Sequence, residues 1–376
     1  MRVAVLTSSR ADYGIYRPLL KAFKADAYFD LSVIAFGSHL SKYHGYTIQN
    51  ILEDGFNVDY TVSSLLLTDD ENAISTAIGL TTIKFAEFWQ AHAGDFDIVF
   101  CLGDRFEMFA AVMAGLSYGV PFAHLHGGEI TLGAIDNVFR HSISMAAKLH
   151  FVSTQAFADK ISALRDDYTG QSDNIIVSGA LSLDNLREIE FLNDAEFLKK
   201  WQIDLSIPTI LITIHPETVE PEKNKLYLQE VLPVLTELKK QYQLVITMPN
   251  VDTNGIIYRE AFIDFGGRYP DRVKLIENFG TQSYFTCMQR VDFMLGNTSS
   301  GIIEAASFNK FVINVGDRQK GRLAGSNVIQ CPFNKEQILK AVADIKNASP
   351  RQFENIYYNG GATEKIVNKL KSIEYR

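Results

Sequence analysis

The stretch Val291-Asp-Phe-Met-Leu-Gly-Asn-Thr-Ser-Ser-Gly-Ile-Ile-Glu304 contains, in short form, the pattern of the whole chain. Its apolar run ends at Leu295 and predicts a buried strand, and the small polar residues that follow predict a turn into a helix. The same succession of strand, turn and helix recurs along the sequence. Strands are expected at 2–7, 31–36, 98–102, 120–126 and 149–152, and again at 209–214, 244–247, 273–276, 293–295 and 311–315.

The turn after Leu295 also has the composition of a diphosphate site. Gly296 and Gly301 permit close backbone approach, and Ser299 and Ser300 place hydroxyls at the expected helix start, where backbone amides attract anions. Glu304 is expected about one turn inside the helix, where its carboxylate can accept hydrogen bonds from a ribose. An ordinary serine cap on a strand-to-helix turn explains these residues equally well.

The segments between the expected strands have the spacing of helices. The segment 74–93 has long helical periodicity, and 107–118 is rich in Ala and Met and largely apolar, as a helix packed on a parallel sheet should be. We therefore predict an α/β fold made of two Rossmann-type, doubly wound parallel-sheet domains.

The length of 376 residues favours more than one domain, since roughly two to three are expected for such a chain. We predict an N-terminal domain at 1–184 and a C-terminal domain at 185–359. A charged helical stretch at 185–201 separates the two sets of strands, and a last helix within 360–376 can pack back on the first domain.

The composition limits the classes of protein to consider. A hydrophobic content of 47% and a charged content of 21% are typical of a globular protein. No apolar stretch reaches the roughly 20 residues of a membrane span, and the first residues already form a strand, so we expect a cytoplasmic protein without membrane partners. The net charge of −8 argues against a nucleic-acid surface. Three widely separated cysteines predict buried free thiols.

Several common active-site motifs are absent from the sequence. It contains no GxGxxG dinucleotide fingerprint, no GxxxxGK[ST] phosphate loop and no GxSxG nucleophile elbow. The segment His124-Leu-His126-Gly-Gly-Glu129 offers residue types that bind metals, but no further ligand cluster accompanies it. His126 is more simply interpreted as the end of a strand, and we expect no metal.

Polar residues follow the expected strands, where ligands of open parallel sheets bind. In the first half Asp104, Glu129 and Asp136 are candidate general acids and bases, although Asp104 can equally cap a helix. Arg10 follows the first strand and can meet a phosphate or a base, or can lie solvated on the surface.

In the second half two cationic or titratable residues occupy equivalent positions. His215 precedes Pro216 at a strand end, where its imidazole can donate to a leaving phosphate oxygen. Arg318, in Gly316-Asp-Arg-Gln-Lys-Gly321, can supply positive charge, although basic residues at such turns are usually just solvated.

In combination, these segments resemble one family, the hydrolysing UDP-N-acetylglucosamine 2-epimerases. The resemblance covers nearly the whole chain. It is carried by Ser9-Arg-Ala-Asp-Tyr13, Gly103-Asp-Arg105, His126-Gly-Gly-Glu129, Asp136 with Arg140-His141, His215-Pro216, Gly296-Asn-Thr-Ser-Ser-Gly301 and Gly316-Asp-Arg-Gln-Lys-Gly321.

The resemblance implies a GT-B-like fold, with the two domains facing across a cleft that holds the nucleotide sugar. It implies conversion of UDP-N-acetylglucosamine and water to N-acetylmannosamine and UDP, the entry to sialic acid synthesis for capsule polysaccharides. It also implies a homodimer that uses neither a metal nor a nicotinamide cofactor.

The resemblance further implies a reaction by elimination of UDP to a glycal, followed by hydration. Asp104, Glu129 and Asp136 would serve the proton transfers at C2, with no assignment of individual steps. His215 would be the fourth catalytic residue and would assist the departure of UDP. The remaining site residues would bind the nucleotide: the diphosphate by Arg10, Ser299, Ser300, Gly301 and Arg318, the ribose by Glu304, and the uracil by the loops at Asn250 and Phe279.

Three other functions compete with this one. A hydrolysing UDP-N,N'-diacetylbacillosamine 2-epimerase of legionaminic acid synthesis has the same chemistry and almost the same resemblance. A GT-B glycosyltransferase would use the same fold and diphosphate loop but would transfer the sugar to an acceptor without exchange of its C2 hydrogen. A non-catalytic nucleotide-sugar sensor would have no use for the three loop carboxylates.

Overall fold

The computed structural model describes residues 1–66, 68, 70–165, 174–249, 255–349 and 351–373. The chain forms two compact units. The first contains Met1–Glu129, Asp136–Arg187 and Tyr357–Arg376, and the second contains Ile130–Ile135 and Glu188–Ile356. No helix within these described ranges has both the length and the apolar composition needed to cross a membrane.

The first unit is built on a parallel sheet of seven strands in the order β3-β2-β1-β4-β5-β6-β7. Alternate residues of β1 face opposite sides of this sheet, as the pleat requires, and both sides are buried. Val3 and Val5 pack into one core with α1, α2 and α14, and Ala4 and Leu6 pack into another with α3, α4 and α5. The strands are β1 (Arg2–Thr7), β2 (Asp30–Phe36), β3 (Tyr60–Val62), β4 (Ile98–Leu102), β5 (Phe122–Leu125), β6 (Leu149–Val152) and β7 (Ile175–Val177).

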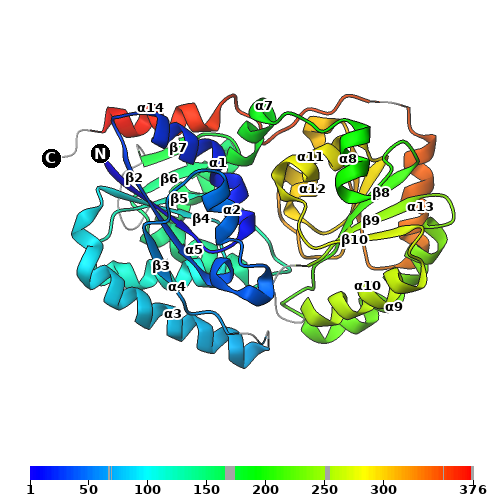
Figure 1. Cartoon of the computed structure of the whole chain (residues 1–376), viewed down its shortest axis with the longest axis horizontal. Helices are drawn as coiled ribbons and strands as arrows, with labels where there is room; N and C mark the ends of the chain where they lie inside the picture. The colour runs from blue at the N-terminus through cyan, green and yellow to red at the C-terminus, as the bar shows by residue number, and fades with distance from the viewer. Residues whose placement is uncertain (67, 69, 166–173, 250–254, 350, 374–376) are drawn as a thin grey trace. The chain divides into compact units, whose positions relative to one another are not determined.

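Helices cover both faces of this first sheet (Figure 1). The C-terminal helix α14 lies beside α1, and Lys371 forms an ion pair with Asp26 at 2.5 Å. The helices are α1 (Arg10–Ala25), α2 (Ile48–Glu53), α3 (Glu71–His92), α4 (Phe106–Gly115), α5 (Asp136–Ala146), α6 (Gln155–Arg165), α7 (Asn185–Glu188, at the junction with the second unit) and α14 (Ala362–Ser372), with short 3-10 turns such as η1 (Gly37–Leu40).

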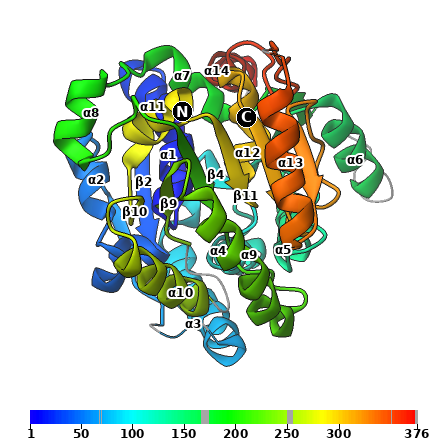
Figure 2. The same ribbon diagram turned by 90° about the vertical axis from the view of Figure 1, so that its right-hand side faces the viewer.

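The second unit has a parallel sheet of six strands in the order β10-β9-β8-β11-β12-β13. Its strands are β8 (Thr209–Thr213), β9 (Gln243–Thr247), β10 (Val273–Ile276), β11 (Phe293–Gly296), β12 (Phe311–Val315) and β13 (Val328–Cys331). Helix α9 lies beside both α10 and α13 (Figure 2). The helices are α8 (Asp194–Trp201), α9 (Asn224–Leu238), α10 (Gly255–Arg268), α11 (Gly280–Arg290), α12 (Ser299–Ile303) and α13 (Lys335–Asn347).

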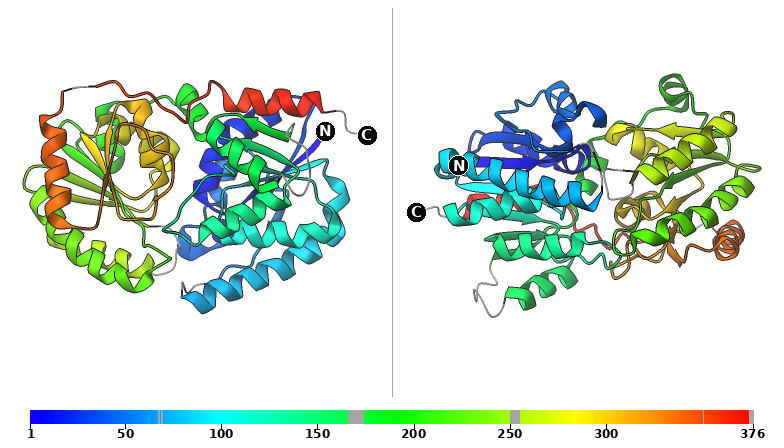
Figure 3. Two further views of the ribbon diagram at one scale, coloured as in Figure 1. Left: turned by 180° about the vertical axis from the view of Figure 1, so that it is seen from behind. Right: turned by 90° about the horizontal axis from the view of Figure 1, so that it is seen from below.

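The predicted α/β fold with two doubly wound parallel sheets is confirmed, and two further views show the helices of each unit around its own sheet (Figure 3). The three cysteines are free and buried, as expected. The prediction of one helical stretch at 185–201 is wrong. Helix α7 ends at Glu188, and α8 begins anew because Asn193 and Glu196 form a capping box.

The strand order reverses at one place in each sheet, between β1 and β4 in the first and between β8 and β11 in the second. At such a switch point the two neighbouring loops leave the sheet in opposite directions and open a crevice at the carboxyl ends of the strands. Asp104 and His215 lie in the loops after β4 and β8, Arg10 begins the helix that follows β1, and Gly296 ends β11. The fold thus places these three candidates and the turn at Gly296 at the strand ends where open parallel sheets usually bind ligands, and their roles stay predictions.

Candidate functional site

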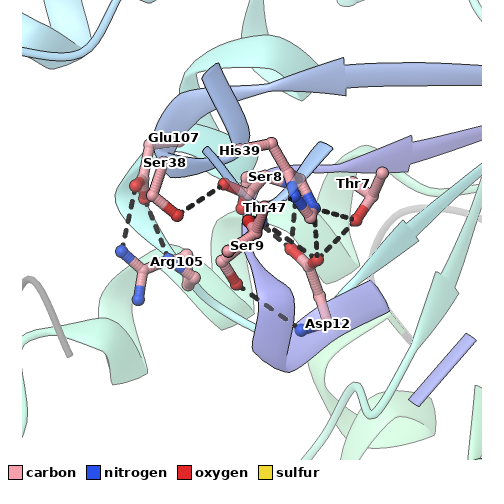
Figure 4. A network of polar contacts seen from close by, with 9 residues as sticks. All are labelled: Thr7, Ser8, Ser9, Asp12, Ser38, His39, Thr47, Arg105 and Glu107. Atoms are coloured by element: carbon pink, nitrogen blue, oxygen red, sulfur yellow. Dashed lines mark hydrogen bonds and ion pairs between the residues drawn. The ribbon is translucent and has the colours of Figure 1, made fainter. Parts of the chain in front are cut away.

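The loop after β1 is fixed by one buried carboxylate, that of Asp12 in the first turn of α1 (Figure 4). Its Oδ1 accepts hydrogen bonds from Thr7 Oγ1 at 2.6 Å and from the Ser9 amide at 3.1 Å, and its Oδ2 accepts from the Ser8 amide at 2.9 Å and Ser8 Oγ at 2.8 Å. Ser9 caps the helix in return. Arg10 therefore starts α1 from a turn whose backbone has little freedom.

The imidazole of His39 completes this network from the loop after β2. Its Nε2 lies 2.9 Å from Thr7 Oγ1 and its Nδ1 lies 2.8 Å from Thr47 Oγ1, so both ring nitrogens have a partner. Burial acts to raise the pKa of Asp12, but the neighbouring His39, Thr7 and Ser8 outweigh it and hold this pKa below its ordinary value.

The loop after β2 is pressed against the loop after β1. Gly37 has φ 56° and a Cβ on it would lie 2.8 Å from the Ser8 carbonyl oxygen, so only glycine fits there. Ser38 Oγ donates to the same carbonyl at 3.0 Å, and the nearby Glu107, almost fully buried, pairs with Arg105 at 2.9 Å (Figure 4).

One of the predicted carboxylates, Asp104, pairs with an arginine of α5, and a second, Asp136, begins that helix. Asp104 follows β4 and forms an ion pair with Arg140, whose side chain is buried on α5. Asp136 is the first residue of the same helix, and residues four apart share a helix face. The helix α4 after Asp104 begins at an N-cap, Arg105, that makes no side-chain cap hydrogen bond, so Asp104 does not serve as its cap.

The third carboxylate, Glu129, is bound within the unit. Its Oε1 lies 2.7 Å from Nδ1 of His126 and accepts a hydrogen bond from Ser153 Oγ at 3.2 Å. His124, two residues before His126, has both ring nitrogens bonded, Nδ1 to Ser144 Oγ at 3.0 Å and Nε2 to the Gly103 carbonyl at 2.8 Å. Burial lowers the pKa of His124 to about 3. Among the described residues no group of three or more His, Cys, Asp or Glu side chains is arranged to hold a metal ion.

In the second unit, the loops after β8 and β11 are locked together. Gly296 has φ 147° and a Cβ on it would lie 1.9 Å from the Thr213 carbonyl oxygen, so glycine is required where β11 passes β8. The buried Asn297 accepts from the His215 amide at 2.7 Å and donates to the His215 carbonyl at 2.9 Å. This pair of bonds fixes the backbone of His215, which is buried itself.

The loop after β12 joins the same assembly through Glu217 and Gln319. The amide of Asp317 donates to Glu217 Oε1 at 2.5 Å, and Gln319 Nε2 donates to the Asn297 carbonyl at 2.9 Å. Burial raises the pKa of Glu217. Arg318, half-buried between Asp317 and Gln319, therefore stands on a fixed backbone.

The turn at Gly296 departs in detail from the sequence prediction. Thr298, not a serine, caps α12, which has only five residues, so Glu304 lies at its C-terminal end and not one turn inside a longer helix. A Cβ on Gly301 would lie 2.9 Å from Val312 Cγ1, so this glycine lets α12 pack on the sheet. Ser299 is exposed and Ser300 half-buried, and both hydroxyls start the helix as expected.

A six-residue segment, Ile130–Ile135, belongs to the second unit although Glu129 and Asp136 on either side belong to the first. The Leu132 amide donates to the Lys320 carbonyl at 2.9 Å, and the Ile135 amide donates to Thr218 Oγ1 at 3.1 Å. A Cβ on Gly133 would lie 2.3 Å from the Asp317 carbonyl oxygen. The segment thus packs on the backbone that carries Arg318.

The two residues proposed for uracil differ in what can be said of them. Phe279 is buried and packs edge-on against Trp201 at 4.8 Å between ring centroids, so its side chain serves the core and only its backbone is available for a base. Asn250 lies outside the described residues.

The structure gathers the candidates into two sets. Asp104, Asp136 and Glu129 lie with Arg10 in the first unit, and the remaining described candidates lie in the second, namely His215, Phe279, Ser299, Ser300, Gly301, Glu304 and Arg318. The roles of all these residues stay predictions. Sequence reasoning missed the residues that hold them, above all Asp12, His39, Asn297 and Glu217. Their only signal in the sequence is a polar side chain beside a strand end.

Comparison with known proteins identifies the family. The family model described as UDP-N-acetylglucosamine 2-epimerase matches residues 21–371. The chain is 32% identical to the hydrolysing UDP-N,N'-diacetylbacillosamine 2-epimerase of Legionella pneumophila, over 99% of this chain and 96% of the relative. It is also 32% identical to the hydrolysing GDP/UDP-N,N'-diacetylbacillosamine 2-epimerase of Campylobacter jejuni, over 89% and 85% of the two chains.

A solved structure shows the same fold. The UDP-GlcNAc 2-epimerase of Neisseria meningitidis, bound to UDP-GlcNAc, superposes with a TM-score of 0.79 at 18% identity and covers 99% of this chain and 100% of its own. The match of the family model over most of the sequence, together with the Legionella relative aligned over nearly its whole length, shows that the chain belongs to the UDP-N-acetylglucosamine 2-epimerase family.

Proposed function

We propose that the protein is a hydrolysing UDP-sugar 2-epimerase, which releases UDP and a free 2-acetamido sugar inverted at C2. The observation that carries this proposal is the interlocked set of loops after β8, β11 and β12, where buried hydrogen bonds fix the backbone around His215, Ser299 and Arg318. Hydroxyls, an imidazole and a guanidinium on a fixed backbone suit the diphosphate of a departing UDP.

In the first step the C1–O bond to UDP breaks while the C2 proton is removed, and the C2–H electron pair forms the double bond of a glycal. Because the C2 proton is weakly acidic, departure of UDP must lead, and stabilisation of its negative charge is the main catalytic need. Arg10, His215, Ser299, Ser300 and Arg318 are proposed for this task. Gly301 keeps the backbone close, and Glu304 is proposed to bind the ribose.

In the second step C2 is protonated on the opposite face and water adds at C1, which gives the free epimer. Acid and base groups are therefore needed on both faces of the ring. Asp104, Glu129 and Asp136 are proposed to supply or to position them. The ion pair with Arg140 fixes the orientation of the Asp104 carboxylate, which supports a role for Asp104 in one of these proton transfers.

The comparisons suggest two UDP sugars as candidate substrates. The two hydrolysing relatives at 32% identity favour UDP-N,N'-diacetylbacillosamine as the first substrate to test. The description of the family model favours UDP-N-acetylglucosamine, which would give N-acetylmannosamine for sialic acid synthesis. The two differ at C4 and C6 of the sugar, and the chemistry at C1 and C2 is the same.

Proton NMR of the protein with each nucleotide sugar in deuterated water tests the proposal. We expect free UDP together with a free sugar that carries deuterium at C2. Transfer to an added acceptor without deuterium at C2 would instead indicate a glycosyltransferase. Binding of UDP without turnover of either sugar would refute the proposed reaction.

A pair of variants tests the diphosphate site. Replacing both Ser299 and Ser300 by alanine should weaken UDP binding about 100-fold or more, since each hydrogen bond to a charged group contributes about 1.5–3 kcal/mol. The matched control is Ser206→Ala, an exposed serine whose hydroxyl contacts only Asp204 among the described residues. Calorimetric titration with UDP measures both, and equal affinities would exclude the two serines from the site.

A further inference from the structure

His126 has an unusual backbone conformation for its place in the fold. It follows the last residue of β5 with φ 63°, in the left-handed region. Residues other than glycine rarely adopt this region, because their Cβ crowds the backbone there. Gln202 and Asn309 also have positive φ, but they end helices, where this conformation is common. Tyr46, with φ 48°, lies in an exposed turn that its amide closes on the Ser41 carbonyl. His126 has no such explanation, because it lies between a strand and a glycine turn.

The side chain of His126 is held in one orientation by Glu129. Nδ1 lies 2.7 Å from Glu129 Oε1, and Ser153 Oγ donates to the same oxygen at 3.2 Å. Glu129 is only 1% exposed. A carboxylate accepts hydrogen bonds, so the proton of the neutral imidazole resides on Nδ1 and the lone pair on Nε2.

The basic nitrogen of this pair has no partner. Nε2 of His126 is buried and makes no hydrogen bond with any described residue. The neighbouring His124 is different, since both of its ring nitrogens are bonded, to Ser144 and to Gly103. Leaving a buried polar atom unpaired destabilises the folded state. His150 also has an unpaired ring nitrogen, Nδ1, but its Nε2 meets Arg165 at 2.7 Å and its backbone is not in the left-handed region, so the combination of features distinguishes His126.

Strain, orientation by a carboxylate and an unpaired Nε2 together describe a general base. We propose that His126 is a catalytic residue of the reaction at C2, and this inference rests on the proposed function. Nε2 takes the C2 proton as the C2–H electron pair forms the C1=C2 bond and the C1–O pair leaves with UDP. The imidazolium then loses this proton to water.

In this assignment Glu129 is a positioning residue and does not touch the sugar. Its carboxylate keeps the proton on Nδ1 and stabilises the imidazolium while it lasts. The acid that protonates C2 from the other face is then one of the remaining loop carboxylates, Asp104 or Asp136.

The test compares three variants of the full chain in deuterated water, with UDP release and C2 deuteration as readouts. Replacement of the base, in His126→Gln, should lower kcat about 10²- to 10⁴-fold and leave the dissociation constant of UDP unchanged. Glu129→Gln should lower kcat less, with KM unchanged. The control is His92→Gln, because His92 also pairs through Nδ1 with an acid three residues later, Asp95 at 2.8 Å, but on the surface.

A cavity variant separates chemistry from folding. Glycine suits the left-handed backbone, so His126→Gly should fold, and added imidazole should restore part of its turnover. Near wild-type turnover by His126→Gln would overturn the inference, and so would a His126→Gly variant that folds but is not rescued. A wild-type protein inactive on both UDP sugars would instead refute the proposed function itself.

Discussion

Replacing Asp12 by asparagine should destabilise the first unit severely. Both carboxylate oxygens of Asp12 accept a backbone amide, Oδ1 that of Ser9 and Oδ2 that of Ser8. Either orientation of an asparagine side chain therefore turns its NH2 group toward an N–H donor, and one buried amide loses its acceptor. The unpaired amide costs about 1–3 kcal/mol, and loss of the charge removes a further contribution of about 1.5–3 kcal/mol from the hydrogen bonds that remain. We expect a loss of about 3–5 kcal/mol.

Urea unfolding measures this loss if the first unit is observed alone. The chain has two tryptophans, of which Trp89 is buried in the first unit and Trp201 lies in the second. In a Trp201→Phe background, fluorescence reports the unfolding of the first unit. The control is Asp95→Asn, because this side chain is 52% exposed and pairs only with His92 among the described residues. It should change stability by less than about 1 kcal/mol.

The pH dependence gives a second check on the same side chain. The pKa of Asp12 lies below its ordinary value of 3.8 in the folded protein. The carboxylate therefore stabilises the fold above that value, and this contribution is lost as pH falls through the folded-state pKa. The difference between wild type and Asp12→Asn should shrink below pH 3.8. A difference under about 1 kcal/mol at neutral pH would refute the assigned role.

Three further variants test other parts of the structure. Gly133→Ala should weaken UDP binding about tenfold or more, because its Cβ would displace the Asp317 backbone, whereas Gly267→Ala, at an open helix position, should not; equal UDP titrations would contradict this. Asn297→Asp, which cannot donate to the His215 carbonyl, should lower the free energy of unfolding by about 2–4 kcal/mol and should lower turnover. An unchanged midpoint of urea unfolding would show that this pair of hydrogen bonds does not stabilise the fold. The folded-state pKa of His124 is about 3, below its ordinary value of 6.5. As pH falls below 6.5 the unfolded chain binds a proton at His124 that the folded chain does not, so the free energy of unfolding decreases. His124→Asn should therefore lose less stability in acid titrations over this range.

Much of the fold could be predicted because its central strands are apolar runs that end at glycine or polar residues, as in Ile98–Leu102 and Phe311–Val315. The strands that escaped prediction are β3, β7 and β13, which are short, lie at or next to a sheet edge and are only partly buried. Polar residues interrupt β3 and β13, and β7 is apolar but only three residues long, so none of them gives a long apolar run. Their pairing depends on a neighbour that the local sequence does not reveal.

The positions of the candidate residues could be predicted from the sequence better than their contacts could. Asp104, Glu129 and His215 follow strands, so their positions come from the order of elements alone. Their partners come from other loops, and Glu217 meets Asp317 across a separation of 100 residues. Such contacts depend on strand order and backbone geometry, as does the strained conformation of His126, and neither is encoded in local composition.

The path of the chain also has an evolutionary consequence. The polypeptide passes between the two units after Glu129, Ile135, Arg187 and Ile356, so neither unit is one continuous stretch of sequence. A gene fragment that encodes residues 188–356 alone would lack the segment that pairs with Lys320 and Thr218. A single recombination event therefore does not exchange one unit for another. In a chimaera of two relatives, the segment Ile130–Ile135 should come from the same parent as the residues that it contacts, Lys320 and Thr218.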